Sequence, residues 1–548
     1  MIVRTLCGEC SVGCGVRARL DPGRDLAIEG DTVHPANAGA LCERGLALGE
    51  EKALAGRLLH PLVGGRRVGW DRAVAAITRR LADDRSGSRV AMQMAGDLLT
   101  EDYYAANKLM KGFLGTAHIG LAHGEGGGIA AAHIAALGED VTPATYEDLE
   151  QADVLIQIGA DIASTHPILF DRIEAARAQN GLRLIRIGRS EPESRAAPDL
   201  GLPVRPGTES TLLAGLLLHC RDAGLLDAAW LDQAVNASTH FWRDLRRGHD
   251  LWSVAQTCGL PPSAIRAFFD RVAAQSRLVS LFVPEDEDRP NRDLAAAILN
   301  LHLATGRIGR RGAAPMIIGR AGNGMGAREA GCLASDLAAH MDFAPDAVDR
   351  VARFWSAPSM ARSPGLAGEP LVEAIRRGEI DILWLFGGAS LDDPLMRQAI
   401  ALSPFTIMAT DRLDPDLAHH IDIVLPAVAG LERNGTMTSA DRLISRHRPV
   451  LTPPGEARAP WWMVMKVANA MGWGSAFPYE HPADIYREHA RLAAYQNDGA
   501  RLFDLRRHAS VSNPAYDELT PWRWGGAPFD DGHFPTPDGR ARLVPSWL

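Results

Sequence analysis

The chain has 548 residues, of which 46% are hydrophobic and 23% are charged, and its formal net charge is -9. A single core rarely grows beyond about 250 to 300 residues, so several domains are expected. The acidic balance argues against a nucleic-acid partner, and the lack of any run of about 20 apolar residues argues against a membrane protein. Only six residues precede Cys7, too few for a leader of about 15 to 30 residues, so we expect a cytoplasmic protein.

Four cysteines stand out in the first fifty residues. Cys7, Cys10, Cys14 and Cys42 follow the pattern C-x2-C-x3-C-x27-C. Structural zinc sites usually join two close pairs of ligands, whereas three close cysteines and one distant cysteine commonly hold a 4Fe-4S cluster. A disulfide framework is typical of small secreted chains, and this chain is large. The spacing therefore predicts an iron–sulfur site.

Helix and strand patterns alternate after the cysteines. Apolar spacing predicts a helix over 66–82, and 89–96 is typical of a short buried strand. A further helix is expected within 98–115, with Thr100 and Asp102 as candidate caps and an end near Gly112 or Gly115.

The region from Asp153 to Gly188 predicts a βαβ crossover. The apolar run 154–159 is the first strand, 168–180 is the helix, and 182–188 is the second strand. Further strands are expected at 277–284, 381–388, 405–411 and 421–427. The result is a doubly wound α/β body, in which ligands bind at the carboxyl ends of strands.

Two other stretches are candidates for ligand contact. Thr208 and Glu209 precede an apolar helix at 210–220, where they either cap the helix or place a carboxylate on a guanine. The stretch 301–331 is dense in glycine and carries five arginines. Glycine permits close backbone approach and arginine matches oxyanions, and a long loop of this kind is usually either functional or disordered.

The cysteine pattern, followed directly by Glu43, Arg44 and Gly45, resembles the molybdopterin oxidoreductase superfamily. Within that superfamily the chain looks like the assimilatory, cytoplasmic nitrate reductase catalytic subunit, because long stretches are similar and occur in the family's order. These stretches are 98–117, 145–161, 202–209, 301–310, 323–331, 431–449 and 536–542.

The resemblance implies a fold of the formate dehydrogenase and DMSO reductase type, with a small iron–sulfur domain and two doubly wound, Rossmann-like domains of parallel sheets. The implied parts are a 4Fe-4S domain at 1–57, a discontinuous pterin-binding domain at 58–120 and 330–450, a dinucleotide-binding domain at 121–329, and a C-terminal extension of the body at 451–548. The family continues into a barrel-like closing domain. We expect this domain to be absent here or to come from a separate subunit.

The resemblance also implies a molybdenum bis-molybdopterin guanine dinucleotide cofactor. Arg44 would lie between the cluster and a pterin, and Asn323, Met325 and Arg328 would border the substrate funnel, where Arg328 attracts nitrate. The two dinucleotides would be faced by Gly159, Asp161, His166, Gly207, Thr208 and Glu209 on one side and by Gly387, Asp411, Glu432, Gly435, Thr436, Asp441 and Arg442 on the other.

This sequence departs from the family where the metal ligand is expected. The segment 115–133 contains no cysteine. Counting back from Tyr146 places Glu125 at the ligand position, and counting forward from Gly115 places Gly126 there. A carboxylate can bind a hard, high-valent metal, and four glycines nearby equally suggest a decayed loop.

Three nucleotide turns also differ from the family. Asp161 replaces an asparagine, 188–190 replaces Asp-Pro-Arg, and 388–389 replaces Thr-Asn. Loss of an acidic partner for a guanine would leave buried donors unpaired, at a cost of about 1 to 3 kcal/mol per group.

Three functions are compatible with these features. The first is a molybdenum oxidoreductase that takes electrons from a donor protein or reductase subunit through the cluster and reduces nitrate or a similar small anion. The second is a cluster-only electron-transfer or structural subunit that has lost molybdenum. The third, formate dehydrogenase chemistry, is supported only by His123 near the expected metal position.

Substitution of the candidate ligand tests its role. If the Glu125 carboxylate binds molybdenum, Glu125→Ala should abolish bound molybdenum, as measured by elemental analysis of the purified protein. An unchanged molybdenum content would contradict this role.

Overall fold

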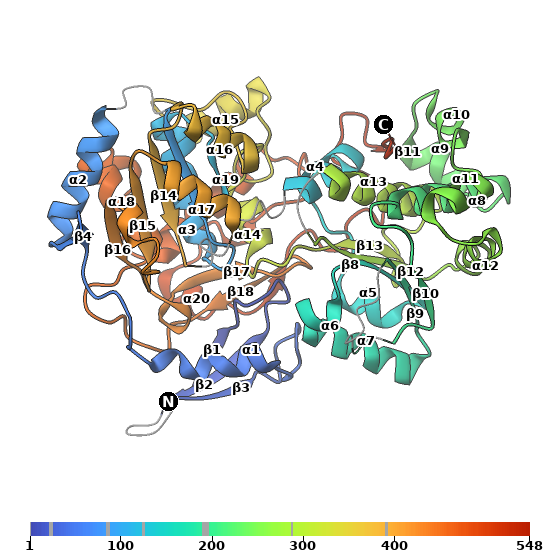
Figure 1. Ribbon diagram of the computed structural model, residues 1–548, viewed down its shortest axis with the longest axis horizontal. Helices are drawn as coiled ribbons and strands as arrows, with labels where there is room; N and C mark the ends of the chain where they lie inside the picture. Colours follow the sequence, from blue (N-terminus) through green and yellow to red (C-terminus); the bar gives the residue numbers. More distant parts are fainter. Residues whose placement is uncertain are drawn as a thin grey trace.

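The computed structural model describes residues 2–20, 26–83, 88–122, 127–188, 195, 197–285, 289–388 and 393–547. Figure 1 shows two α/β bodies side by side, with a small N-terminal sheet below them. No helix in these ranges is long and apolar enough to cross a membrane.

The N-terminal part is a three-stranded antiparallel sheet. Its strands are β1 (Ile2–Leu6), β2 (Gly15–Leu20) and β3 (Leu26–Gly30), and α1 (Glu43–Ala47) and η1 (Leu48–Lys52) follow. Because Leu6 pairs with Gly15, residues 7–14 form the loop that joins β1 to β2.

The first α/β body contains five parallel strands in the order β10-β9-β8-β12-β13. The strands are β8 (Val154–Gly159), β9 (Arg183–Ile187), β10 (Leu200–Leu202), β12 (Leu278–Val283) and β13 (Ala314–Ile317). The predicted βαβ crossover is confirmed, since α7 (Pro167–Asn180) joins β8 to β9 and ends at Gly181 in the left-handed conformation. The chain leaves β8 toward β9 on one side and returns to β12 on the other. The topological switch point therefore lies between β8 and β12.

Helices cover both faces of the first sheet (Figure 1). They are α4 (Gly127–Leu137), α5 (Tyr146–Gln151), α6 (Ile162–Thr165), α8 (Glu209–Asp222), α9 (Ala228–Ala234), α10 (Phe241–Arg246), α11 (Leu251–Cys258), α12 (Pro262–Ala273) and α13 (Arg289–Ala304).

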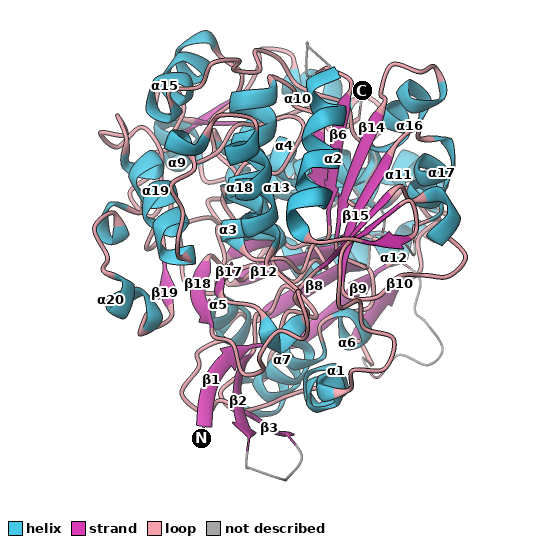
Figure 2. Cartoon of the chain, turned by 90° about the vertical axis from the view of Figure 1, so that its left-hand side faces the viewer, coloured by secondary structure: helices cyan, strands magenta, loops and turns pink. Residues whose placement is uncertain are grey.

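The second body contains seven strands in the order β5-β4-β16-β15-β14-β6-β7, of which β16 to β7 are parallel. Figure 2 shows β6, β14 and β15 together, with helices on either side. The strands are β4 (Leu62–Val63), β5 (Arg66–Arg67), β6 (Val90–Met94), β7 (Ile119–Leu121), β14 (Ile382–Phe386), β15 (Thr406–Thr410) and β16 (Ile423–Pro426). Its helices include α2 (Trp70–Asp83), α3 (Thr100–Asn107), η2 (Lys108–Leu114), α15 (Pro345–Trp355), α16 (Gly368–Arg376) and α17 (Pro394–Leu402).

Two details of the predicted helices are wrong. The helix expected over 66–82 begins at Trp70, because Gly64 and Gly65 form a tight turn with positive φ and return the chain as the antiparallel strand β5. Thr100 is the first residue of α3 and not its cap. The Asp102 carboxylate does bond the helix start, since it accepts the Leu99 N–H at 3.1 Å.

The glycine-dense stretch 301–331 is also not one loop. It contains the end of α13, the strand β13 and the short helix α14 (Gly324–Glu329).

The helix expected within 98–115 consists of α3 followed directly by the π-helix η2. It ends at Gly115, whose φ is 77°.

The C-terminal residues pack on both bodies. Helices α18 (Pro460–Ala470) and α19 (Pro482–Ala494) lie against α3, and β20 (Ala541–Arg542) pairs with β11 (Val235–Asn236). The strand β19 (Trp522–Arg523) completes a three-stranded sheet with β17 (Gly435–Thr438) and β18 (Leu443–His447). The remaining short elements are η4 (Ala418–His420), η5 (Gly430–Glu432), η6 (Gly474–Ala476), η7 (Arg506–His508) and α20 (Asn513–Asp517).

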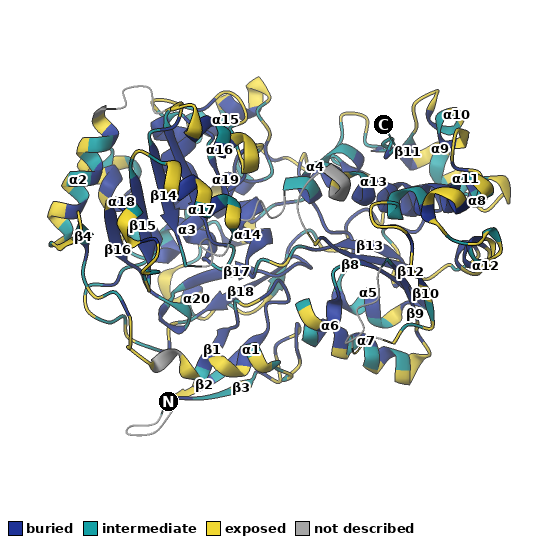
Figure 3. Cartoon of the chain, in the orientation of Figure 1, coloured by how far each residue is buried: buried dark blue, intermediate teal, exposed yellow. Residues whose placement is uncertain are grey.

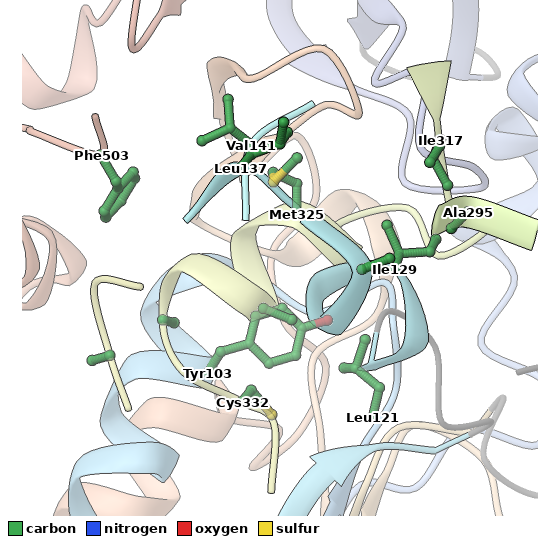
Figure 4. Packing of buried hydrophobic residues seen from close by; sticks show 14 of the residues in the cluster. Tyr103, Leu121, Ile129, Leu137, Val141, Ala295, Ile317, Met325, Cys332 and Phe503 are labelled. Carbon is green, nitrogen blue, oxygen red and sulfur yellow. The ribbon is translucent and has the colours of Figure 1, made fainter. Parts of the chain in front are cut away.

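One large core joins the parts of the molecule. The strands of both sheets are mostly buried (Figure 3). Figure 4 shows side chains of this core. Leu121 comes from the second sheet, Ile317 from the first sheet, Met325 from α14, and Phe503 from the C-terminal segment. The two bodies therefore share buried apolar contacts.

A pair of glycine substitutions tests how closely the N-terminal loop packs. A Cβ at Gly322 would lie 1.8 Å from the Gly8 carbonyl oxygen, whereas a Cβ at Gly319 meets nothing within 4 Å. Gly322→Ala should lower the free energy of unfolding by about 1 to 3 kcal/mol through overpacking, and Gly319→Ala should change it little. Thermal and urea unfolding of both variants checks this, and equal stability would contradict the packing.

Candidate metal and cofactor site

The four predicted ligands lie at one end of the N-terminal sheet. Cys7, Cys10 and Cys14 are buried in the loop between β1 and β2, and the Cys7 N–H donates to the Cys14 carbonyl at 2.9 Å. Cys42 is half-buried and directly precedes α1. The hairpin geometry thus gathers three thiols in one turn and places the fourth at a helix start.

The thiols influence one another electrostatically. Burial raises the pKa of Cys10 to about 11, and the charge of Cys42 adds to it. Burial also raises the pKa of Cys7 and Cys14, with contributions from the other cysteines. A thiolate is a metal ligand, so bound iron would supply the positive charge that four clustered thiolates require.

The donor set fits a 4Fe-4S cluster, in which four cysteines bind one group of several metal atoms. Within the described ranges, no three His, Cys, Asp or Glu side chains are arranged to hold a single metal ion.

The cysteine loop docks on the carboxyl edge of the first sheet. The Ser11 hydroxyl donates to the Gly319 carbonyl at 2.7 Å and lies 2.9 Å from His166 Nε2. The Tyr146 hydroxyl donates to the Ser11 carbonyl at 3.0 Å. These bonds place the predicted cluster beside the sheet edge where ligands of α/β proteins bind.

Arg44 and His166 lie next to this contact. The Arg44 guanidinium donates to the Thr165 carbonyl at 2.7 Å. The two ring nitrogens of His166 contact Ser11 Oγ and Thr165 Oγ1, and burial lowers the pKa of His166 to about 4. His166 is therefore a neutral residue that positions the loop, with both nitrogens already occupied.

The turn after β8 is held by protein contacts. Gly159 has a φ of 82°, and a Cβ there would lie 2.1 Å from the Val283 carbonyl oxygen, so the position requires glycine. The buried Asp161 carboxylate accepts the Ala163 N–H at the start of α6 and lies 3.2 Å from the Arg186 guanidinium. Asp161 is thus engaged with the protein.

Gly188 follows β9, and the exposed Gly207 lies after β10. A Cβ at Gly207 would meet nothing within 4 Å, and a Cβ at Gly188 would lie 3.8 Å from Glu209 Oε1. Thr208 occupies the cap position of α8, but its hydroxyl donates to the Arg205 carbonyl at 2.7 Å and makes no cap bond. The structure thus brings Gly188 and Glu209 close together and leaves Gly207 exposed.

At the second sheet, Gly387 and Asp411 follow β14 and β15 at the same edge, and Gly387 has a φ of 97°. Asp411 Oδ2 lies 3.7 Å from Arg57 Nε. Arg57 also forms a bidentate pair with the buried Glu432, with both N···O distances at 2.7 Å. Arg57 was not predicted, because no local pattern distinguishes it from other arginines.

Gly435 and Thr436 surround the buried Glu101. The Thr436 N–H and hydroxyl donate to the Glu101 carboxylate at 2.8 and 2.9 Å, and the Tyr516 hydroxyl donates to it at 2.6 Å. A Cβ at Gly435 would lie 2.5 Å from Glu101 Oε2. Burial raises the pKa of Glu101, which these hydrogen bonds oppose.

Asp441 and Arg442 contact the C-terminal segment. Arg523 donates to the Asp441 carboxylate. The fully buried Arg442 has a φ of 70° and donates to the carbonyls of Thr142 at 2.9 Å and Trp524 at 2.6 Å, and burial lowers its pKa to about 10. Both side chains are occupied by protein partners.

The three predicted funnel residues are buried together. Asn323 donates to the Leu98 carbonyl at 2.9 Å. Arg328 Nε donates to Asp140 at 2.6 Å, and its Nη2 lies 3.4 Å from Met325 Sδ. Burial opposes the charge on Asp140, but Arg328 and His133 hold its pKa well below the usual range. Arg328 is thus already paired with an acid.

Several residues of the predicted site lie outside the described residues. They are His123, Glu125, Gly126, Arg189, Ser190 and Ala389.

The fold, the loop with three cysteines and Cys42 at the start of α1 are those expected of an iron–sulfur protein with two α/β bodies. The family model described as the Molybdopterin oxidoreductase Fe4S4 domain matches residues 1–51, and that described as Molybdopterin oxidoreductase matches residues 57–470. The chain belongs to the molybdopterin oxidoreductase family.

Known proteins resemble most of the chain. It is 41% identical to a nitrate reductase of Klebsiella oxytoca, and the match covers 95% of this chain and 61% of that relative. It is 33% identical to a nitrate reductase of Shewanella frigidimarina, and the match covers 99% of this chain and 61% of that relative. The chain thus spans less than two thirds of these relatives. Acetylene hydratase from Pelobacter acetylenicus has a similar fold, with a TM-score of 0.77 and 17% identity over 98% of this chain and 77% of that one.

Cysteine substitution tests the cluster. Cys14→Ser should abolish the visible iron–sulfur absorption and sharply lower the iron content, because one thiolate ligand is lost. The matched control is Cys258→Ser, since Cys258 is a buried thiol in α11, where its Sγ donates to the Thr208 carbonyl at 3.6 Å. Unchanged iron in Cys14→Ser would contradict the cluster assignment.

Proposed function

We propose that this chain is the catalytic part of a molybdenum-dependent oxidoreductase of the nitrate reductase type. Electrons would enter at a cluster held by Cys7, Cys10, Cys14 and Cys42 and reach a molybdenum centre that reduces nitrate or a similar small oxyanion. The sequence identity of 41% to the Klebsiella oxytoca nitrate reductase, over 95% of the chain, supports this function.

The observation that carries the proposal is the position of the cysteine loop. Ser11 ties this loop to Gly319 and His166 at the carboxyl edge of the first sheet. A cofactor bound at this sheet edge would then lie on one side of the cluster, close to an electron donor bound on the other side. Arg44 links the N-terminal part to the first body through its bond to the Thr165 carbonyl.

The cofactor proposed is a bis-molybdopterin guanine dinucleotide. When bound, it supplies oxygen-atom transfer and two-electron redox chemistry, while the protein binds, orients and shields it. Gly207, Thr208 and Glu209 would hold one nucleotide where the turns leave space, and Gly387 and Asp411 would hold the other. We propose that Glu432, Asp441 and Arg442 position the surrounding backbone, because their charged groups are paired with protein.

We propose that Arg328 orients the oxyanion while its Nε stays bonded to Asp140. A guanidinium fork suits a planar anion and still has donors beyond its Nε. The partner proposed is an electron-donor protein or reductase subunit. We further propose a cytoplasmic location.

Metal and nucleotide analysis tests this function. Protein purified from a molybdenum-replete host should contain iron, near-stoichiometric molybdenum, and GMP released by acid, and it should reduce nitrate with a chemical electron donor. Growth of the same host without molybdate is the control, and should remove molybdenum and activity but leave iron. Iron without molybdenum or GMP in the replete host would contradict the proposal and favour a cluster-only electron-transfer subunit.

A further inference from the structure

Three buried side chains form a hydrogen-bonded triad that includes the proposed substrate arginine. Arg328 Nε donates to Asp140 Oδ2 at 2.6 Å, and Asp140 Oδ1 lies 2.8 Å from His133 Nδ1. All three residues are buried, and no part of His133 is exposed. The carboxylate of Asp140 therefore joins a guanidinium on one side to an imidazole on the other.

The local fold brings His133 and Asp140 together. His133 lies in α4, and Gly138, directly after this helix, turns the chain with a φ of 89°. Glycine adopts this conformation without steric cost. Figure 4 shows Leu137, the last residue of α4, beside Met325 of α14, the helix of the proposed substrate arginine. The turn thus places the acid between α4 and α14.

The hydrogen bond to Asp140 fixes which nitrogen of a neutral His133 carries the proton. A carboxylate only accepts hydrogen bonds, so Nδ1 donates to it and Nε2 is unprotonated. This Nε2 is buried and has no hydrogen-bond partner among the described residues. Burial opposes the charge on Asp140, but Arg328 and His133 hold its pKa well below the usual range. Asp140 therefore stays a carboxylate, and Nε2 of His133 is the free basic position of the triad.

The charges of the triad balance before any substrate binds. The positive charge of Arg328 and the negative charge of Asp140 cancel, and a neutral His133 adds none. An oxyanion bound at Arg328 would therefore leave a negative charge without compensation in the interior, which is costly. A proton on Nε2 of His133 would restore the balance, because the Asp140 carboxylate stabilises the imidazolium that forms.

A second buried acid, Glu139, is already matched by a base. Its carboxylate lies 2.9 Å from His340 Nδ1. Burial lowers the pKa of His340, but the neighbouring acids, with Glu139 foremost, outweigh this effect and raise the pKa. His340 thus favours its charged form before an oxyanion binds, and His133 is left to gain a proton.

Helix α13 and strand β20, which pack on α4, add no histidine with a free nitrogen. Both ring nitrogens of His302 in α13 are bonded, to the Ser280 hydroxyl and the Arg307 carbonyl, each at 2.9 Å. Arg542 in β20 pairs with the Asp538 carboxylate at 3.0 Å. The other described residues of these two elements that carry charge are Arg292 and Asp293, of opposite sign.

We propose that binding of an oxyanion at Arg328 is coupled to the uptake of one proton by Nε2 of His133, through the Asp140 carboxylate that bonds both. That the oxyanion binds at Arg328 rests on the proposed function, whereas the triad itself is a feature of the structure. His133 is a positioning residue: it holds Asp140 against Arg328 and matches the charge of this pair to the bound anion. The coupling favours singly charged oxyanions, because one proton balances one negative charge.

Proton uptake on nitrate binding tests this inference. Nitrate is added to the purified protein, of known iron and molybdenum content, in weakly buffered solution with a pH indicator, and its affinity is measured by calorimetry. We expect uptake of up to about one proton per bound nitrate. Because the protonated form binds the anion more tightly, the affinity should fall as the pH rises from about 6 to 8, by up to about tenfold per pH unit. Nitrate binding without proton uptake would overturn the proposal, as would the absence of nitrate binding.

His133→Asn assigns the proton to its residue. The asparagine amide can still donate to Asp140 but cannot gain a proton. Proton uptake and the pH dependence of nitrate affinity should both disappear, and the affinity at pH 6 should fall about tenfold or more. Thermal unfolding shows whether the variant is folded, and His133→Gln, with the same amide on a longer side chain, is the second variant. Retained coupling in either folded variant would overturn the proposal.

His219→Gln is the matched control. His219 in α8 also pairs with a carboxylate, since its Nε2 lies 3.1 Å from Asp270 Oδ1. This variant should bind nitrate with the same affinity and proton uptake as the unmodified protein. Loss of proton uptake in His340→Gln but not in His133→Asn would move the coupling to the other buried histidine and overturn the assignment.

Failure of this inference and failure of the proposed function give different results. Molybdenum and GMP content test the proposed function, whereas proton uptake tests the coupling. Protein without molybdenum that takes up a proton with nitrate, and loses this uptake in His133→Asn, would retain the coupling and contradict the proposed function. Molybdenum-loaded protein that reduces nitrate but binds it without proton uptake would do the reverse.

Discussion

The structure depends on close packing of the cysteine loop against the first α/β body and against the sheet formed by β17, β18 and β19. Gly8 meets Gly322 with no room for a Cβ, and a Cβ at Gly13 would lie 3.1 Å from the Ser439 side chain. Ser11 adds hydrogen bonds to the first body. A loop that presents several thiols to one metal group must be rigid, because ligand geometry fixes the properties of the cluster. Contacts with the first body and with this three-stranded sheet provide the rigidity.

Buried ion pairs impose a second constraint. Arg57 bonds Glu432 across 375 positions of sequence, and Arg328 bonds Asp140 across 188. Removing one member of such a pair leaves an uncompensated buried charge, at a cost of about 3 to 5 kcal/mol. A cofactor that took Glu432 as a direct ligand would have to displace Arg57. The nucleotide is therefore better served by the open turns near Gly207 than by these occupied carboxylates.

The sequence predicted what is encoded locally. The strands at 154–159 and 182–188 were found because continuous apolar runs and a closing glycine are visible within a few residues. The helix start was misplaced because the apolar spacing extends back over residues 66–69, where the chain after the turn at Gly64 and Gly65 forms the strand β5. The engagement of Asp441 with Arg523, or of Arg442 with the Thr142 carbonyl, left no local pattern. These partners are 82 and 300 positions apart in the sequence, so only the folded chain identifies them.

The C-terminal segment completes the interior of the molecule. The backbone N–H groups of Leu502 and Phe503 donate to the buried Glu139, which also bonds His340 at 2.9 Å. Trp524 donates from its indole to Glu329 at 2.6 Å, next to Arg328 in α14. Without residues from this segment, each acid would lose hydrogen bonds in the interior and keep only its other partner, His340 for Glu139 and Thr438 for Glu329, at a substantial desolvation cost. The segment thus fixes α14, and with it the residues proposed to meet the substrate.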